Sequence, residues 1–322
     1  MKEQNKPKKP IIGLALGSGS ARGFAHIGVL KALGEMNIVP QVITGSSVGA
    51  FIGGVFISDA LASFEESVCQ LNWKDIVGLF DFNFSGGGII MGDRLSKFLL
   101  KYLGEKNIQD FDIRFGAVST ELTTGREIWF QTGLLHDAVR ASMSLPGLFA
   151  PVRINHQMLA DGGIVNPVPV SICRAMGADI VIAINLNGDV VGKHFSSKQP
   201  KNIPIKWFES SEPDDKDKET LNPFKQRLIK GLKQSMQTVF SHRNGQKSKM
   251  PNMFDVLASS VNIMQDRITR SRMAIDPPDL LIEPRLSHVG WLEYYSANEC
   301  IQEGYDCVWK NKAAIDKLLL TI

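Results

Sequence analysis

Two short apolar stretches near the N-terminus, each leading through small residues into a helical pattern, constrain the fold more than any other feature. Ile11 to Leu16 is continuously apolar, which is typical of a strand buried on both faces of a parallel sheet. A helical pattern follows from Phe24 to Met36, then a short strand from Gln41 to Thr44 and an apolar helix from Val48 to Phe56. Because parallel strands are joined by helical crossovers, this order predicts an α/β fold with a parallel sheet.

The alternation continues along the chain. The turn from Thr123 to Arg126 should join two strands in a hairpin. Further strands are expected at 115–120, 127–131, 157–159, 180–185 and 280–282, and helices at 61–71, 93–103, 134–143, 170–176, 253–273 and 297–320. The helix that starts at Met253 has an apolar stripe, the side of a helix that normally faces a core; its members are Leu257, Val261, Met264 and Ile268.

The composition is that of an ordinary folded protein, with 43% hydrophobic and 21% charged residues. A net charge of +3 gives no reason to expect nucleic acid as a partner. The four cysteines are scattered and form no CxxC pair, so we expect a reducing compartment and no metal site. The lysines before Ile11 imitate a signal peptide, but the apolar run is short and is better explained as the first strand. The longest other apolar run, Val48 to Ile57, is too short to cross a bilayer.

The second strand leads into Gly45-Ser46-Ser47-Val48-Gly49, which fits the nucleophile-elbow pattern Gly-x-Ser-x-Gly. In such an elbow, Gly45 and Gly49 permit a sharp turn from strand to helix that exposes the hydroxyl of Ser47. The pattern alone is weak, since a tight turn without any chemistry also satisfies it. Its interpretation therefore depends on whether the chain supplies a base and an oxyanion hole.

The loop after the first strand, Gly17 to Gly23, has two functional interpretations. A dinucleotide fold needs Gly-x-Gly-x-x-Gly, but Arg22 occupies the third glycine position and no acidic residue ends the second strand. In an acyl-transfer enzyme, the small residues Gly17, Ser18 and Gly19 would let backbone N–H groups converge on a developing oxyanion. A plain tight turn is the third alternative.

A base for Ser47 could come from Asp161, which ends a strand in the sequence Asp161-Gly162-Gly163. Its two glycine neighbours let the backbone approach another loop closely. The competing interpretation is a turn aspartate that bonds to its own backbone, which is the commoner role of Asp-Gly pairs.

Taken together, these motifs resemble the patatin-like phospholipase family, of the bacterial type related to the catalytic domain of neuropathy target esterase. The resemblance runs from about Ile11 to Asn185 and adds two later segments. Its motifs occur in the family's order: Gly17 to Gly23, the elbow around Ser47, Ala141-Ser142 with Leu145-Pro146, Asp161-Gly162-Gly163, Ile263 to Arg267 and Pro278 to Ile282.

The resemblance implies a patatin-like three-layer sandwich, with a mainly parallel central sheet flanked by helices. It also implies a Ser-Asp dyad without histidine, in which Ser47 is the nucleophile and Asp161 the general base. The oxyanion hole would be Gly17, Ser18 and Gly19, although the family often has three consecutive glycines there; a serine keeps the backbone N–H. Arg22 matches the family's basic residue and is expected to hold the loop in shape. The other motif positions are Gly23, Gly45, Gly49, Gly162 and Gly163.

The expected function is hydrolysis of carboxylic ester bonds in phospholipids, lysophospholipids or simpler esters, through an acyl-enzyme and without cofactor or metal. The expected organisation is one overall domain made of a basic N-terminal tail, the catalytic core, a polar mobile loop and a helical C-terminal part that packs on the core. These four parts are residues 1–10, 11–187, 188–223 and 224–322. The expected location is cytoplasmic, with peripheral contact at the inner membrane face as a further expectation.

Two alternatives remain open for the chemistry. An α/β-hydrolase with a Ser-Asp-His triad would use His288 as base, and a catalytically silent lipid-binding or scaffold protein would use neither Ser47 nor Asp161. A separate question concerns residues 224–249, which contain seven basic residues and no acid. This segment is either an interfacial helix that docks on anionic lipid or a helix that packs on the core with its charged face solvated.

Overall fold

The computed structural model describes residues 9–70, 93–146, 148–190 and 253–320. Most of the basic tail, the polar loop beyond residue 190 and the basic segment 224–249 lie outside the described residues. The chain divides into two units, residues 1–194 with 262–322 and residues 195–261. The sheet and the site described below belong to the first unit, as does α9 from Asn262 onward.

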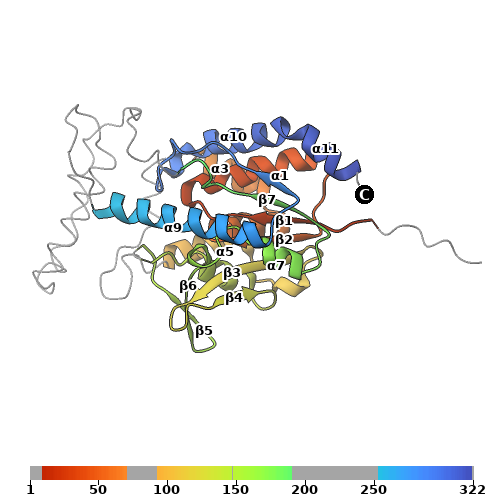
Figure 1. The fold of residues 1–322 in the computed structure, drawn as a ribbon. Helices are drawn as coiled ribbons and strands as arrows, with labels where there is room; N and C mark the ends of the chain where they lie inside the picture. Colours follow the sequence, from red (N-terminus) through yellow and green to blue (C-terminus); the bar gives the residue numbers. More distant parts are fainter. Residues whose placement is uncertain (1–8, 71–92, 147, 191–252, 321–322) are drawn as a thin grey trace, which may run out of the picture. The chain divides into compact units, whose positions relative to one another are not determined.

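A mixed sheet organises this unit, and its described part has eight strands in the order β5-β6-β3-β2-β1-β7-β8, with β4 paired to β3 (Figure 1). The run from β3 to β8 is parallel throughout, whereas β4, β5 and β6 pair antiparallel. The strands are β1 Ile12–Leu16, β2 Val42–Ser46, β3 Arg114–Glu121, β4 Glu127–Phe130, β5 Val152–Ile154, β6 Gln157–Asp161, β7 Ile180–Ile184 and β8 Leu280–Ile282.

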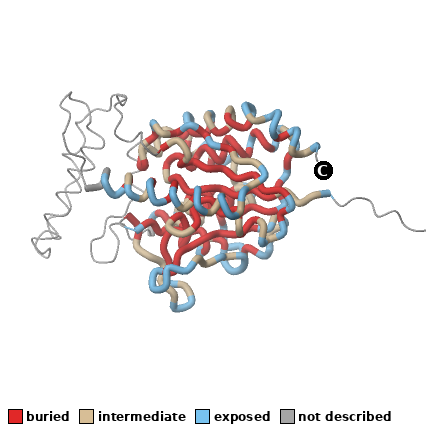
Figure 2. The backbone as a smooth tube through the Cα atoms, in the orientation of Figure 1, coloured by how far each residue is buried: buried red, intermediate tan, exposed pale blue. Residues whose placement is uncertain are grey.

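Helices cover both faces of the sheet, which explains why β1 is apolar at every position. On one face, a Cβ on Gly13 would meet the Cys173 side chain of α7. On the other face, Gly53 of α2 lies against Ile43, Phe115 and Leu16. The helices of the described chain are α1 Ala25–Glu35, α2 Val48–Ile57, α3 Leu61–Cys69, α5 Asp93–Leu103, α6 Leu135–Ser142, α7 Val170–Ala175, α9 Met253–Ile275, α10 Ala297–Lys310 and α11 Lys312–Leu320. Figure 2 shows that the central strands are buried.

Helix α10 packs against α1 through two glycines, which joins the C-terminal part of the chain to the loop after β1. A Cβ on Gly28 would lie 1.9 Å from the carbonyl oxygen of Ile301, and one on Gly304 would lie 2.1 Å from that of Ala25. No side chain fits at such distances, so the two helix backbones are in direct contact. This contact fixes the start of α1, and with it the end of the glycine-rich loop.

The predicted α/β class, the mainly parallel sheet and the hairpin between β3 and β4 are confirmed. The sequence does not predict the three-residue strand β5, which is too short for a periodic pattern.

The apolar stripe of α9 is not the buried side of the helix. Leu257 and Met264 are 41% and 53% exposed, while the buried side of the helix is polar. On that side, the side-chain oxygens of Asn262 and Gln265 accept hydrogen bonds from Arg22 and Asn187. The buried positions of α9 are Ala258, Asn262, Gln265, Asp266 and Thr269. Among the described residues, no helix is both long enough and apolar enough to span a lipid bilayer.

Candidate active site

Ser47 lies at the junction between β2 and α2, where the chain makes a sharp turn. Its backbone has φ 55° and ψ −123°, a conformation in which a side chain is strained and glycine is preferred. A residue held in this way at the end of a strand is a typical sign of a functional position. The turn places Ser47 at the lining of a pocket.

The two elbow glycines are required by close backbone contacts. A Cβ on Gly45 would lie 2.3 Å from the backbone nitrogen of Ala50, and one on Gly49 would lie 2.1 Å from the carbonyl oxygen of Leu16. Both clashes are with backbone atoms, which cannot move without displacing β1 or α2. The spacing of Gly45 and Gly49 around Ser47 is therefore a steric requirement of the turn.

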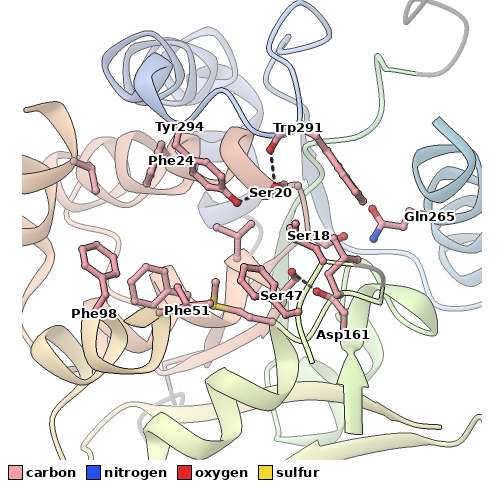
Figure 3. Close-up of a pocket in the computed structure, with 18 of the residues that line it drawn as sticks. Ser18, Ser20, Phe24, Ser47, Phe51, Phe98, Asp161, Gln265, Trp291 and Tyr294 are labelled. Carbon is pink, nitrogen blue, oxygen red and sulfur yellow. Dashed lines mark hydrogen bonds between the residues drawn. The ribbon is translucent and has the colours of Figure 1, made fainter. Parts of the chain in front are cut away.

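Asp161, the last residue of β6, lies directly beside Ser47. The hydroxyl of Ser47 donates a hydrogen bond of 2.5 Å to Asp161 Oδ2 (Figure 3). The other carboxylate oxygen, Oδ1, accepts a 2.7 Å hydrogen bond from the backbone N–H of Gly163. Antiparallel pairing of β6 with β3, and a hydrogen bond from Thr120 Oγ1 to the carbonyl oxygen of Asp161, fix this end of the strand.

The carboxyl group of Asp161 is fully buried. Removal from water raises its pKa from 3.8 to about 6, and the hydrogen bonds from Ser47 and Gly163 oppose part of that rise. A carboxylate with a pKa near 6 is ionised at neutral pH and is a much better proton acceptor than an exposed aspartate. The site therefore holds a hydroxyl and a basic carboxylate in direct contact.

The glycine-rich loop passes over Ser47, and its backbone donors are not equivalent. The N–H of Gly17 donates to the carbonyl oxygen of Ile184 at 3.0 Å, and that of Ser18 donates to Pro167 at 2.8 Å. Within the described part of the chain, the N–H of Gly19 has no hydrogen-bond acceptor. Of the three positions named from the sequence, Gly19 is thus the one whose donor is available to a ligand.

Arg22, near the end of this loop, has a buried side chain that links the loop to α9. Its Nε donates to the carbonyl oxygen of Gly19 at 3.2 Å, and its Nη2 donates to Asn262 Oδ1 at 3.0 Å. Burial lowers its pKa to about 10, which still leaves it charged at neutral pH, and the charge of Asp189 counteracts part of the effect. Next to it, Gly23 makes room for Val48, because a Cβ there would lie 2.1 Å from that side chain.

Gly162 and Gly163 let the turn after Asp161 fit closely into the site. A Cβ on Gly162 would lie 2.2 Å from the carbonyl oxygen of Val118, and one on Gly163 would lie 2.5 Å from Gln265 Nε2. The carbonyl of Val118 is backbone, so the first clash could not be relieved by a rotamer change.

The hydroxyl of Ser47 opens into a pocket with two different sides (Figure 3). One side is apolar and contains an aromatic cluster, in which the rings of Phe51 and Phe64 are edge to face with centroids 5.0 Å apart. The polar side is formed by the glycine-rich loop, Gln265 and the hydroxyl of Tyr294. Trp291 lies beside Gln265, so this side also contains one large aromatic residue. The other apolar residues of the lining are Phe24, Val48, Val68, Leu95, Phe98, Met143, Leu145, Leu148 and Phe149. The pocket could receive a molecule with a long hydrocarbon part and a polar part.

The site also contains residues to which no role was assigned from the sequence. Ser142 Oγ accepts a 2.9 Å hydrogen bond from the backbone N–H of Ser47, which holds the elbow. Tyr294 OH lies 3.0 Å from Ser20 Oγ, whose backbone has a positive φ of 52°. Ser142 and Gln265 fall in segments that carry the family resemblance, whereas no sequence pattern distinguishes Tyr294.

The histidine alternative receives no support from this geometry. His288 Nε2 is 2.8 Å from Glu299 Oε1, on a half-exposed side chain that does not line the pocket. His26 is buried with Nε2 2.8 Å from the carbonyl oxygen of Gly17, and burial lowers its pKa to about 4, so it is neutral. Within the described residues, no group of three or more His, Cys, Asp or Glu side chains could hold a metal ion.

Comparisons with known proteins identify the family. The family model described as patatin-like phospholipase matches residues 14–174. An uncharacterized NTE family protein of Mycobacterium tuberculosis is 32% identical, over 92% of this chain and 89% of its own length. The lysophospholipase NTE1 of Yarrowia lipolytica is 34% identical over 54% of this chain but only 12% of its own length. Among solved structures, VipD from Legionella pneumophila matches with 15% identity and a TM-score of 0.41, covering 98% of this chain and 67% of that one.

Proposed function

The chain belongs to the patatin-like phospholipase family and is a lipid hydrolase; on that premise, we propose that it cleaves carboxylic ester bonds of lipids through a Ser-Asp dyad, Ser47 and Asp161. The single observation that carries the proposal is the 2.5 Å hydrogen bond from Ser47 Oγ to the buried carboxylate of Asp161. No third group intervenes between them, so the proton has a direct path from nucleophile to base.

In the first half of the reaction, Ser47 Oγ attacks the ester carbonyl carbon while its proton passes to Asp161 Oδ2. The carbonyl π electrons move to the oxygen, which becomes an oxyanion. When this tetrahedral intermediate collapses, the carbon–oxygen bond to the alcohol breaks and the alcohol takes the proton from Asp161. The products are an acyl-enzyme ester on Ser47 and the released alcohol.

The proposed oxyanion site is the loop formed by Gly17, Ser18 and Gly19, together with the N-terminus of α2. Within it we assign the direct contact to the N–H of Gly19, since the N–H groups of Gly17 and Ser18 bind protein carbonyls. A donor of this kind is typically worth about 3 kcal/mol in the transition state. Arg22 would act on the reaction indirectly, by holding the carbonyl of Gly19.

In the second half, water attacks the acyl-enzyme and gives up a proton to Asp161. Collapse of the second tetrahedral intermediate releases the fatty acid, and the proton returns to Ser47 Oγ. A pKa near 6 suits both steps, because the carboxylate is ionised at neutral pH yet basic enough to accept a proton in each attack.

Hydrolysis of a substrate panel tests this proposal. Phospholipids, lysophospholipids and short-chain esters are offered to the wild-type protein, to Ser47→Ala and to Asp161→Asn, with labelling by a fluorophosphonate probe as a second readout. We expect both variants to lose at least a thousandfold in kcat/KM, and Ser47→Ala to lose all labelling. Most of the activity surviving in Ser47→Ala would refute the nucleophile, and a mild loss in Asp161→Asn would refute the base.

A separate proposal concerns membrane contact by the basic segment 224–249, at the inner face of the membrane. It rests on composition alone, because the segment lies outside the described residues. Co-sedimentation with anionic liposomes should weaken when Lys225, Arg227, Lys230 and Lys233 are neutralised. Unchanged co-sedimentation would remove this proposal.

A further inference from the structure

The amide of Gln265, on the buried polar side of α9, lies at the edge of the pocket and has no role in the steps above. Figure 3 shows Gln265 on the opposite side of Ser47 from Phe51 and Phe98. The side chain is 5% exposed, so its position is defined by its neighbours rather than by solvent. A buried amide in such a place needs partners for both its oxygen and its nitrogen.

A chain of hydrogen bonds determines which way the amide points. Asn187 Nδ2 donates to the carbonyl oxygen of Ser18 at 3.3 Å, and since a carbonyl can only accept, this atom must be the nitrogen. The same Nδ2 donates to Gln265 Oε1 at 3.0 Å. The oxygen of Gln265 is therefore directed at Asn187, and its NH₂ group must point the other way.

The NH₂ group of Gln265 lies against the turn that follows the base. Its Nε2 is so close to Gly163 that a Cβ there would come within 2.5 Å. Gly163 in turn donates its N–H to Asp161 Oδ1. Among the described residues, Gln265 Nε2 has no hydrogen-bond acceptor, so this NH₂ group at the pocket lining is able to donate to a ligand near the reacting atoms.

The polarity of the pocket sets the direction in which a lipid ester would bind. The hydrocarbon chain fits the aromatic cluster at Phe51, Phe64 and Phe98, because burial of apolar surface there is favourable. An acyl chain on that side places the alcohol part of the ester on the side of Gln265. This step rests on the proposed esterase function of Ser47.

We propose that Gln265 is a substrate-binding residue that recognises the leaving alcohol, by donating a hydrogen bond to an oxygen of its glycerol or phosphodiester part, and that Asn187 is the positioning residue that orients it. Both kinds of oxygen are acceptors, which suits a donor-only NH₂ group. The interaction selects esters whose alcohol carries such an oxygen over esters whose alcohol has none.

Three substrates with the same acyl chain test the proposal: palmitoyl lysophosphatidylcholine, monopalmitoylglycerol and p-nitrophenyl palmitate, all presented in the same detergent micelles. The first offers phosphodiester and hydroxyl oxygens, the second only hydroxyls, and the third neither of these acceptors. Gln265→Met removes the donor together with the bond to Asn187, whereas Gln265→Glu keeps an oxygen for Asn187 but replaces the donor with a carboxylate that also repels a phosphodiester. Thr269→Val is the matched control, one turn further along the same buried side of α9.

Loss of a hydrogen bond to a charged group should lower kcat/KM for the lysophospholipid about tenfold to a hundredfold in both Gln265 variants. The value for p-nitrophenyl palmitate should change less than threefold in the uncharged variant Gln265→Met, and Thr269→Val should match the wild type on all three. A loss on monopalmitoylglycerol as large as that on the lysophospholipid assigns the contact to a hydroxyl, while a smaller loss assigns it to the phosphodiester.

An equal loss on all three substrates would overturn the proposal, since it would mean that Gln265 only supports the fold or Asp161. Values of kcat/KM that stay at the wild-type level for all three substrates would overturn it as well. Failure of the proposed function looks different: wild-type protein would then hydrolyse none of the three, or Ser47→Ala would remain active.

Discussion

Replacing Asp161 with asparagine should make the protein more stable while it abolishes activity. The carboxyl group is fully buried, and its pKa is raised from 3.8 to about 6 chiefly because burial disfavours the ionised form. At neutral pH the folded protein holds this negative charge out of contact with water, which lowers its stability. Asparagine has nearly the same shape and carries no charge, and its oxygen can still accept from the N–H of Gly163.

The size of the effect follows from the pKa of Asp161. The difference between 3.8 and about 6, at about 1.4 kcal/mol per pH unit, corresponds to about 3 kcal/mol of unfolding free energy. Because the folded pKa is the higher one, wild-type stability is fully retained below pH 3.8 and falls as pH rises to about 6. The variant should therefore gain about 3 kcal/mol at pH 8 and almost nothing at pH 3.5.

Thermal unfolding of the wild type, Asp161→Asn and Ser47→Ala at pH 3.5, 6 and 8 measures this gain. For a chain of this length, about 3 kcal/mol corresponds to a rise in Tm on the order of 5 °C at pH 8. Ser47→Ala is the matched control: it is equally inactive but keeps the buried carboxylate and removes a hydrogen bond from it, so it should show no rise. A rise for Asp161→Asn that is the same at all three pH values, or absent at pH 8, would refute the electrostatic reasoning.

Three further predictions concern the same turn and base. Wild-type kcat/KM, measured by fatty-acid release, should rise about tenfold per pH unit up to about pH 6 and then level off, as Asp161 becomes ionised; a flat profile from pH 4 to 8 would contradict its role as base. Ser47→Gly should be more stable than Ser47→Ala by about 1 kcal/mol of unfolding free energy, measured by calorimetry. Glycine relieves the backbone strain at φ 55°, and both variants lack the hydroxyl. Gly49→Ala should lose more than about 3 kcal/mol in denaturant unfolding, since its Cβ would lie 2.1 Å from the carbonyl oxygen of Leu16; a loss below about 1 kcal/mol would show that the elbow can relax.

The local features of the fold could be read from the sequence because each is set by neighbouring residues. The unbroken apolar run at β1 required burial on both faces, and helices of the structure cover both faces. Gly45 and Gly49 marked a turn that no other residue fits, which is a steric property of the local backbone. The positions of β1, β2 and α2 followed from these patterns almost to the residue.

The orientation of α9 could not be predicted in the same way. An apolar stripe normally faces a core, yet Met264 is exposed. Arg22 and Asn187 instead donate hydrogen bonds to Asn262 and Gln265 on the buried side. An unpaired buried charge or amide costs more than the exposure of a few apolar side chains, so the polar side of the helix faces inward. The hydrophobic periodicity of a helix shows which of its own residues are apolar. It does not show which buried polar groups from other parts of the chain the helix will face.

By itself, the sequence determined the α/β class, the elbow at Ser47 and the identity of the candidate base, Asp161, because a strand, a strained turn and a family motif are each recorded in a few consecutive residues. Only the tertiary structure decided that Ser47 and Asp161 touch, that burial raises the pKa of Asp161, and that Gln265 faces the pocket. Each of these depends on contacts between residues far apart in the chain. Distance, desolvation and orientation exist only after the chain has folded, which is why no pattern of neighbouring residues could express them.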